Sequence, residues 1–564
     1  GFDFCRFETG GKDETASFRW VYSIPLSFYH CLHRQVKALF FGAIVILVLI
    51  SLIPGDINMF EWMAAPGLLC GSFACWIGIY VGVLYIDYAL LRKKIFSIRA
   101  LLLVLFLCSS YFNNDHPVRY NNEPAKPRIA FKRHFEAWFT EYKKEMDRDA
   151  QFYQRKGKYP VVFICAEGGA LRTGAYTAIF LDKLQDTLAS HNINFKRAVY
   201  AMSGVSGGSL GLGYYNATNF INKPADFNKD FGEDTTAAQR FFIHDFLSPV
   251  IGKMFYGDLL NLFIPFHINR LDRAIGLEQS WEYAYKTLLK DKTQNTFAGN
   301  FLAPYDTATK SPLPLLMINT TEVESGNQAW VTNVTPGNII FAESRDLLGG
   351  KISKGLNYST AINFSSRFPL FSPGGMLSGT KTVKKASGKD TTFGWKLHYI
   401  DGGYYENTGA GSMLELLTQI KHSPLGRQIY PVVIYLRFSD NPADKNSTIN
   451  FGNELSEVIS GIYNTRSGRS TMAVQQLNEL SQRFLNRSFT GTYIDEPLTE
   501  NQRQVPMNWV LSRQSMSNIK RNVNAKLKDS SGRAALPIIL NCKYDFPKIN
   551  PTLESAPKTQ RKAY

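Results

Sequence analysis

Apolar residues are concentrated first in three runs near the beginning of the chain. Ala38–Ile53 and Trp62–Ile86 contain no charged residue, and Ala100–Phe112 is shorter. A helix that spans a bilayer needs about 20 mainly apolar residues. The pattern therefore predicts two spanning helices, and a third if Ile95–Ile98 extend the last run past Arg99. The alternative is that these runs are buried helices of a soluble core.

Beyond Asn113 the pattern changes to short apolar runs that alternate with stretches of helical spacing. Residues Asn113–Lys132 are polar and contain prolines, so we interpret them as a linker. Strand-like runs follow at Val161–Cys165, Ala198–Met202, Leu315–Ile318, Lys396–Ile400, Tyr430–Leu436 and Ile538–Leu540. This alternation predicts an α/β fold with a mostly parallel sheet covered by helices, preceded by a helical transmembrane module.

The chain is therefore expected to have four parts. Residues 1–113 form a membrane module with two to three transmembrane helices, 114–132 a linker, 133–550 the α/β domain and 551–564 a disordered polar tail. One apolar stretch inside the α/β domain, Phe246–Phe266, has two interpretations. It is either part of the core or an apolar lip over a site that takes lipid.

Length, charge and cysteines narrow the class of protein. The chain has 564 residues and begins with Gly, so we expect a fragment or processed form with more than one domain. Its formal net charge of +16 predicts an anionic partner. No compact Lys/Arg run with interleaved aromatic residues is present, which favours a membrane over nucleic acid. The chain has seven scattered cysteines, of which Cys165 and Cys542 lie in predicted strands. None has metal-ligand spacing, and the odd number argues against a disulfide framework.

The first candidate for chemistry is the loop within VVFICAEGGALRTGAYTAIFLDKL, Val161–Leu184. Gly168, Gly169 and Gly174 allow a sharp turn between strand and helix and a close approach of a ligand. Amides at a helix N-terminus bind negative charge. The loop lacks the lysine of a P-loop and the Gly-x-Gly-x-x-Gly pattern of a dinucleotide site. An oxyanion hole remains as the interpretation, and it predicts a nucleophile nearby in the chain.

A candidate nucleophile follows in AVYAMSGVSGGSLGLGYY, which predicts a strand, a tight turn and a helix. Residues 204–208 fit the pattern Gly-x-Ser-x-Gly, in which the glycines permit the strained turn that exposes a serine at the start of a helix. This places Ser206 at the turn. Ser203 and Ser209 lack a glycine two residues away on both sides.

A serine nucleophile needs a base, and Asp401 is the best-placed candidate. In WKLHYIDGGYYENTGAGSMLELL it ends a predicted strand before a Gly-Gly turn, at the edge where open α/β sheets build their sites. The alternative is a turn aspartate that caps the following helix. His398 lies within the preceding strand and His422 at a predicted helix end, so neither has a loop position that recommends it.

The segments EGGALRTG, GVSGG and DGGYYENTG, in this order, resemble the motifs of the patatin-like phospholipases. The resemblance covers roughly residues 159–439, including a serine- and proline-containing block at Ser365–Pro369 that we interpret as structural. That family is known for a Ser–Asp dyad without histidine, in a layout shared with cytosolic phospholipase A2. The resemblance implies that Ser206 is the nucleophile and Asp401 the base, with no metal and no cofactor.

The resemblance also assigns roles in the glycine-rich loop. The oxyanion hole is implied at the amides of Gly168, Gly169 and Ala170. Arg172 corresponds to the basic residue of the family motif, and either holds the loop or faces a lipid phosphate. Ala170 replaces the third glycine of the usual triplet, and Thr173 is an insertion relative to the plain patatin spacing. Both departures are closer to the cytosolic phospholipase A2 arrangement.

The expected function is that of a membrane-anchored serine lipid acyl hydrolase that cleaves fatty-acyl esters of phospholipids or lysophospholipids. One alternative is an esterase or peptidase with a Ser-His-Asp triad, in which His422 is the base. Another is a catalytically silent membrane protein that binds only lipid or a partner. The intact Ser206 and Asp401 count against the silent protein.

The distribution of basic residues predicts the orientation in the membrane. Positive loops stay in the cytoplasm. The loop between the first and second runs carries no Lys or Arg, whereas basic residues precede the first run and fill the loop after the second: Arg34, Lys37, Arg92, Lys93, Lys94 and Arg99. If the third run spans, the α/β domain lies outside the cytoplasm, which in a bacterial inner membrane means the periplasm. If it lies in the interface, the domain is cytoplasmic.

Overall fold

The computed structural model describes most of the chain between Leu26 and Lys548. The described residues are 26–54, 59–92, 97–113, 115–148, 158–228, 236–305, 312–336, 345–349, 352, 354–368, 371–384, 390–438, 454–484, 492–498, 505–529, 534–541, 546 and 548. They fall into two compact units. One contains residues 1–114 and 248–273, and the other contains residues 115–247 and 274–564.

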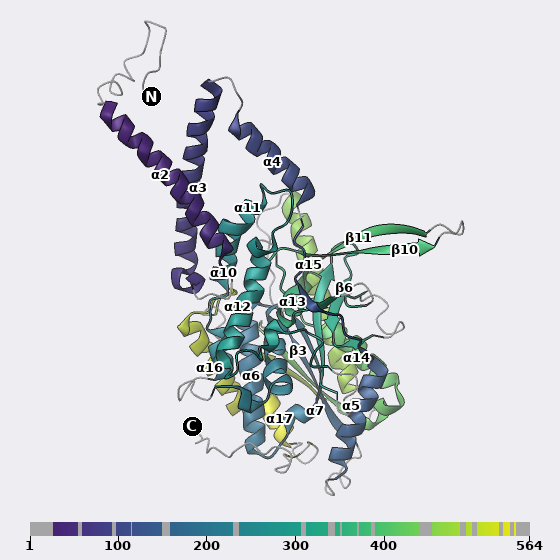
Figure 1. The fold of residues 1–564 in the computed structure, drawn as a ribbon. Coiled ribbons are helices and arrows are strands. Elements are labelled where there is room, and N and C mark those ends of the chain that lie inside the picture. The colour runs from purple at the N-terminus through teal and green to yellow at the C-terminus, as the bar shows by residue number, and fades with distance from the viewer. Residues whose placement is uncertain are drawn as a thin grey trace. The chain divides into compact units, whose positions relative to one another are not determined.

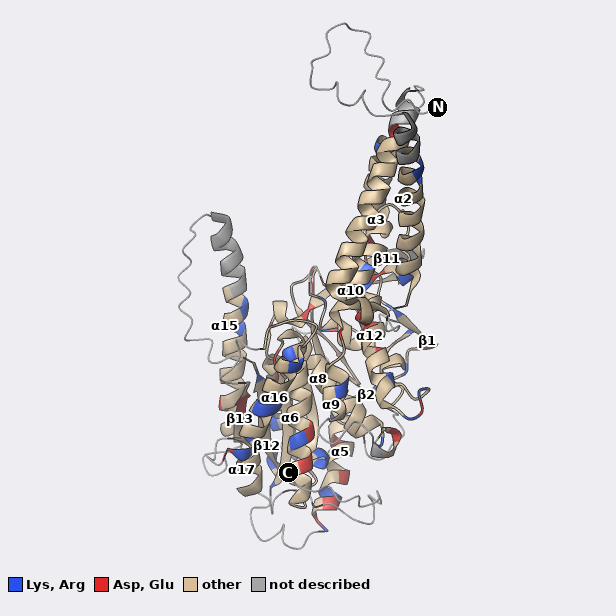
Figure 2. Cartoon of the chain, turned by 90° about the vertical axis from the view of Figure 1, so that its left-hand side faces the viewer, with Lys and Arg blue, Asp and Glu red and all other residues tan. Residues whose placement is uncertain are grey.

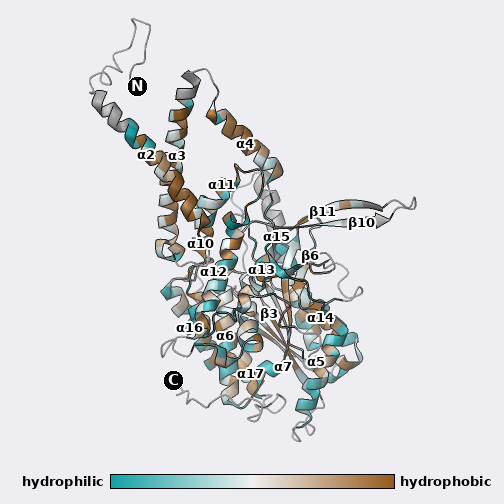
Figure 3. Ribbon diagram, in the orientation of Figure 1, coloured by the Kyte–Doolittle hydropathy of each residue, from teal (hydrophilic) through white to brown (hydrophobic). Residues whose placement is uncertain are grey.

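The first unit contains the apolar N-terminal helices α2 (Leu26–Leu52), α3 (Met59–Arg92) and α4 (Ile98–Phe112), which are brown over most of their length in Figure 3. Two of their segments, His33–Leu52 and Met59–Asp87, are long and apolar enough to cross a membrane. The third helix has 15 residues, about 22 Å at 1.5 Å per residue, and is shorter than a bilayer core. In Figure 2, α2 and α3 carry little charge, whereas Lys, Arg, Asp and Glu are frequent on the helices around the sheet.

The second unit is built on a mixed, mostly parallel sheet in the order β10-β11-β5-β4-β3-β12-β13, with β6 on β5 and β8 on β6. The five strands from β5 to β13 are mutually parallel, whereas β11 and β6 run antiparallel to β5, and β10 runs antiparallel to β11. The bounds are β3 (Tyr159–Ala166), β4 (Val199–Val205), β5 (Leu315–Glu322), β6 (Gln328–Thr332), β8 (Arg345–Asp346), β10 (Gly375–Lys384), β11 (Asp390–Asp401), β12 (Ile429–Arg437) and β13 (Thr492–Pro497).

Helices cover this sheet, as Figure 1 shows. After β3 and β4 the chain crosses through α6 and α8, which pack together with α16, and after β11 it crosses back through α14, which packs on α15. The helices are α5 (Phe131–Met146), α6 (Ala170–Ser190), α7 (Phe195–Ala198), α8 (Gly207–Asn216), α9 (Ala237–Phe242), α12 (Arg273–Leu288), α13 (Tyr358–Phe364), α14 (Ala410–His422), α15 (Glu454–Gln482) and α16 (Arg513–Lys528).

Five of the six predicted strands are confirmed as β3, β4, β5, β11 and β12, and the α/β fold is confirmed with them. The prediction for Ile538–Leu540 was wrong, because these residues lie in helix α17 (Ala535–Asn541). Pro537 stands in the first turn of that helix, where its missing N–H costs nothing. A three-residue apolar run does not distinguish a strand from a buried helix. Cys542 and residues 551–564 lie outside the described residues.

Two stretches have structure that the sequence did not predict. The stretch interpreted as a linker contains β1 (Tyr120–Pro124), which pairs with β9 (Lys354–Leu356), and β2 (Ile129–Ala130), which pairs with β7 (Val334–Thr335). Residues 248–273, which include most of the ambiguous apolar stretch, group with the N-terminal helices instead of the sheet.

Candidate active site

The sheet places Ser206 and Asp401 at the same level of one edge. β4 and β11 both pair with β5, so that Val205 lies opposite Asn319 and Asp401 lies opposite Thr320. Ser206 follows Val205 and is therefore level with Asp401, two strand spacings or about 10 Å away along the sheet. Two side chains that point toward each other close this gap. Although β11 is antiparallel, it delivers Asp401 to the carboxyl edge of the parallel strands.

The two predicted catalytic side chains are in contact. The Ser206 hydroxyl lies close enough to the carboxylate of Asp401 to lower its pKa, and Asp401 Oδ1 accepts the Gly403 N–H at 2.7 Å. Asp401 is 4% exposed, and this burial raises its pKa to about 6 against the lowering effects of those two donors and of Arg466. A carboxylate with this pKa is ionised at neutral pH and is still a better base than an exposed one.

Ser206 sits on a strained turn, with φ 52° and ψ −125°. A non-glycine residue at positive φ is uncommon and marks a backbone held in place by its surroundings. The flanking glycines permit the packing that holds it. A Cβ on Gly207 would lie 1.7 Å from the carbonyl oxygen of Ala170, and one on Gly208 would lie 2.5 Å from that of Ala166. This turn therefore packs directly against the loop that follows β3.

That loop presents two amides at the N-terminus of α6. Among the described residues, none accepts a hydrogen bond from the Gly169 or Ala170 N–H, whereas the Gly168 N–H donates to the Asn407 carbonyl at 2.9 Å. Of the three amides predicted to form the oxyanion hole, that of Gly168 is thus engaged in this structure, whereas those of Gly169 and Ala170 are available. A Cβ on Gly168 would also lie 3.1 Å from the Cβ of Ser206, which puts the loop beside the nucleophile candidate.

Asn407 ties this loop to the turn after Asp401. Besides accepting from Gly168 N–H, it donates from Nδ2 to the Gly168 carbonyl at 3.2 Å and to Glu167 at 3.4 Å. Glu167 in turn accepts the Phe438 N–H at 3.2 Å. Burial raises the pKa of Glu167 to about 7. The glycine loop, the Asp401 turn and the end of β12 are therefore fixed to one another.

Arg172 holds the loop from the other side. Its guanidinium lies 4.0 Å from the centre of the Phe438 ring, and Nη1 donates to the Val505 carbonyl at 3.1 Å. These contacts favour the structural interpretation of Arg172 over a lipid-phosphate contact. The cation beside the candidate base is Arg466, on α15. Its Nη2 and Asp401 Oδ1 both lie within 3.2 Å of the point where a Cβ on Gly403 would stand.

Residues 164–414 match the family model described as patatin-like phospholipase. This part of the chain is a patatin-like phospholipase domain. Its family consists of lipid acyl hydrolases. Among solved structures, the chain is similar to the crystal structure of VipD from Legionella pneumophila, at 10% identity over 65% of this chain and 67% of that one, with a TM-score of 0.22. The search of curated proteins found no match.

In the patatin-like domain, the block after α13 positions both members of the candidate dyad. Ser365 Oγ accepts the Ser206 N–H at 2.8 Å, and the Arg367 carbonyl accepts the Asp401 N–H at 3.0 Å. The Ser365 carbonyl also accepts the Gly402 N–H at 3.4 Å. Sequence analysis treated this block as structural and gave it no such role. Its contacts with Ser206 span about 160 residues, and no local pattern reveals a contact of that kind.

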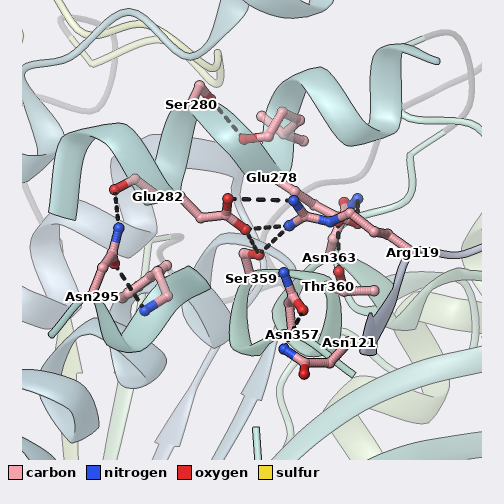
Figure 4. Close-up of polar contacts among 12 residues, drawn as sticks. Arg119, Asn121, Glu278, Ser280, Glu282, Asn295, Asn357, Ser359, Thr360 and Asn363 are labelled. Atoms are coloured by element: carbon pink, nitrogen blue, oxygen red, sulfur yellow. Dashed lines mark hydrogen bonds and ion pairs between the residues drawn. The ribbon is translucent and has the colours of Figure 1, made fainter. Parts of the chain in front are cut away.

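A buried ionic network around Arg119 and Glu278 (Figure 4) reaches the same block through Arg367. Glu278, on α12, is fully buried and accepts hydrogen bonds from three side chains, Arg119, Thr360 and Asn363, at 3.0, 2.6 and 2.9 Å. Arg367 Nη2 lies 3.7 Å from the same carboxylate. The stretch interpreted as a linker thus contributes Arg119 to the interior of the domain.

The histidines considered as bases lie elsewhere in the domain. His398 is bridged between two carboxylates, with Nδ1 2.5 Å from Glu324 and Nε2 2.9 Å from Asp115. His422 ends α14, which begins beside the active-site edge and runs about 18 Å along its axis. The chain then enters β12, whose first residue pairs with the first residue of β3. His422 therefore lies toward the amino edge of the sheet, opposite the edge that carries Ser206.

Proposed function

We propose that this chain is a membrane-anchored lipid acyl hydrolase that cleaves fatty-acyl esters of phospholipids and lysophospholipids. Ser206 is the nucleophile and Asp401 is its base. The observation that carries the proposal is the placement of these two side chains close together at the carboxyl edge of a patatin-like domain, at one level on either side of β5. The separation of His422 from this edge favours the dyad over the triad esterase.

The proposed reaction has two steps. Asp401 accepts the hydroxyl proton of Ser206, whose oxygen attacks the ester carbonyl. The negative charge that develops on the carbonyl oxygen is stabilised by the amides of Gly169 and Ala170 at the N-terminus of α6. The alkoxide of the lipid leaves with the proton from Asp401. Water then attacks the acyl-Ser206 ester with Asp401 as base, and the fatty acid is released.

The apolar helices and the charge support a lipid substrate. Two segments are long and apolar enough to cross a membrane, and a formal net charge of +16 favours an anionic membrane surface. An enzyme anchored in a bilayer shares that bilayer with phospholipid. The proposal involves no nucleic acid, no metal and no cofactor.

The proposal is tested by lipid profiling of the purified chain beside its Ser206→Ala variant, together with a fluorophosphonate probe. We expect the probe to label the wild type and not the variant, and we expect fatty acid to be released from phospholipid by the wild type alone. Labelling of the wild type without phospholipid hydrolysis would indicate that the substrate is another ester. Absence of both labelling and hydrolysis would favour the silent lipid-binding protein.

The rate is expected to depend on the ionisation of Asp401. Because burial raises the pKa of Asp401 to about 6, kcat/KM should fall about tenfold per pH unit below that value and level off above it.

Since Arg466 lowers the pKa of Asp401, Arg466→Gln should move the acid limb of this profile to higher pH. Arg469→Gln is the matched control, because its guanidinium lies over the Tyr405 ring at 4.7 Å. The measurement is a pH profile on a neutral short-chain ester. Equal profiles for wild type and Arg466→Gln would contradict the electrostatic role.

Neither histidine is expected to be essential. His398→Ala and His422→Ala should each keep activity within about tenfold of wild type, since a lost general base typically costs 10²–10⁴ in rate. Hydrolysis of the same ester, measured on variants with an unchanged melting temperature, checks this expectation. A loss of activity in folded His422→Ala would restore the triad esterase.

The catalytic unit is proposed to lie outside the cytoplasm, in the periplasm if the membrane is a bacterial inner membrane. The ends of α2 and α4 contact the same segment, residues 248–273, so α4 returns to the side on which α2 ends. The charge of Arg99, at the start of α4, is paired with Asp87 at 2.5 Å. Fusions after Lys126 should therefore give active alkaline phosphatase and a dark fluorescent protein. A fluorescent protein fusion that is bright, together with a phosphatase fusion that is inactive, would place the domain in the cytoplasm and contradict this proposal.

A further inference from the structure

Residues 248–273 lie within the matched part of the chain, between α9 and α12, and yet belong to the unit of the apolar helices. This segment, called the 248–273 segment below, contains most of α10 (Leu247–Gly252), the π-helix η4 (Lys253–Asp258), α11 (Leu259–Asn261) and η5 (Asn269–Leu271). Both of its ends continue into the other unit. The chain therefore leaves the hydrolase unit, joins the helical unit and returns.

The 248–273 segment shares one apolar core with α2 and α3. Tyr256 is buried in this core among Ala43, Leu47, Phe60, Leu68 and Cys75, and Ile251, Phe255 and Leu260 pack against it. The contact is close at Gly252, where a Cβ would lie 2.4 Å from the Phe60 ring. The segment is thus a packed part of the helical unit.

Polar groups of the 248–273 segment satisfy the end of α2. Lys253 is 1% exposed, and its Nζ donates to the Ser51 carbonyl and to the Arg270 carbonyl, both at 2.8 Å. Arg270 Nε donates to the Leu52 carbonyl at 2.8 Å. The last carbonyls of a helix have no partner within the helix, and cations at this end also stabilise the helix through its dipole. In a bilayer core, where no water is present to bond them, unpaired carbonyls are costly.

Polar side chains of α3 and α4 in turn bond carbonyls of the 248–273 segment. Trp76, in the middle of α3, donates its indole N–H to the Phe255 carbonyl at 2.8 Å. At the end of α4, Asn113 Nδ2 donates to the carbonyls of Asn261 and Ile264 at 3.1 and 2.9 Å. Carbonyls of the π-helix and of the residues at and after the end of α11 are therefore bonded to donors of the apolar helices.

The charges of the 248–273 segment are all paired inside the unit, while apolar side chains face outward. Its five charged residues have partners there: Lys253 and Arg270 as described, Asp258 with Arg273, and Asp272 with His267. Paired charges are what a membrane environment requires. Outside, Phe266 is 64% exposed and Leu262 is 40% exposed, with Arg270 exposed nearby in sequence. Aromatic and basic side chains together are typical of the headgroup boundary.

We propose that the 248–273 segment is embedded in the bilayer at the boundary between headgroups and acyl chains, with Leu262 and Phe266 in contact with lipid. The occupant of this surface is phospholipid, because α2, α3 and α4, on which the segment packs in the same unit, also expose many apolar residues. The inference rests on the membrane anchoring proposed above. It gives the hydrolase unit a second attachment to the bilayer, independent of the chain that leaves α4.

Photo-crosslinking in vesicles tests this inference. A benzophenone amino acid is placed at Phe266 in the Ser206→Ala chain, which is reconstituted in phosphatidylcholine containing radiolabelled phosphatidylcholine. The matched control is the same residue at Val250, which is 1% exposed in the same segment. We expect lipid adducts at position 266 on the order of ten times those at position 250, as for a side chain immersed in the boundary region. If the Phe266 variant does not fold, Leu262 is the second site.

The outcomes separate this inference from the proposed function. A lipid adduct at position 266 supports the inference whatever the wild type hydrolyses, because the chain tested is inactive. A crosslink to protein, or lipid labelling no higher than at position 250, in a chain that resists carbonate extraction overturns the inference and leaves anchoring intact. Release of the chain by carbonate overturns both.

Discussion

Ser206→Ala and Asp401→Asn are each expected to lower phospholipid hydrolysis by about 10⁴-fold or more, and the double variant is expected to be no slower than the slower single variant. The reason is that the two side chains act on one proton. Without Asp401 the hydroxyl of Ser206 has no base in contact, and without Ser206 the carboxylate of Asp401 has no nucleophile to activate. Residues that work as a unit lose their joint effect when either one is removed.

This expectation is checked by kcat/KM on phosphatidylcholine and on a short-chain ester for the three variants. Ser190→Ala, at the exposed end of α6, is the matched control for a serine that has no part in the site. A double variant that is markedly slower than both single variants would contradict the dyad. Folding is controlled by the melting temperature. Because burial raises the pKa of Asp401, its charge destabilises the fold as pH rises through about 6, so Asp401→Asn should melt no lower than wild type at pH 8.

The residues of the candidate site that lie in a glycine-containing turn between a strand and a helix could be predicted from the sequence. Ser206 and Asp401 each follow a strand and precede glycines, and that local pattern is enough to place them at an edge of the sheet. Their common level on either side of β5 depends on strand order and register, which no local pattern encodes. The roles of Ser365 and Arg466 depend on the same long-range arrangement, so sequence analysis missed them.

The fold could likewise be predicted only where the local pattern is long and unambiguous. Buried strands such as β3 are long apolar runs and were found, whereas the three-residue run at Ile538–Leu540 was too short to distinguish strand from helix. Phe246–Phe266 was ambiguous because apolar residues serve a protein core and a membrane equally well. Only tertiary contacts, such as those of Lys253 with the end of α2, assign residues 248–273 to the helical unit.

The second large effect is expected at Glu278. Its carboxylate is fully buried and lies between the cations Arg119 and Arg367, which are themselves largely buried. Removing one member of a buried ionic network leaves the other charges unpaired and typically costs 3–5 kcal/mol. Glu278→Leu should therefore lower the melting temperature by about 6–10 °C, at about 2 °C per kcal/mol for a domain of this size. Glu278→Gln keeps the shape of the side chain and some of its hydrogen bonds, so this variant should lower the melting temperature by less.

The network also reaches the site, because the Arg367 carbonyl accepts the Asp401 N–H, and Ser365, two residues earlier, accepts the Ser206 N–H. Glu278→Gln should then reduce kcat at temperatures where the variant is still folded, with KM little changed. The matched control is Glu141→Gln, which removes a surface pair with Lys144 at 2.7 Å and should cost no more than about 1 kcal/mol. Thermal melting of the full chain in detergent, followed by ester kinetics at a temperature well below every midpoint, measures both effects. If Glu278→Leu melted as close to wild type as Glu141→Gln does, the buried network would contribute nothing to the stability of the domain, and its proposed support of the dyad would fail with it.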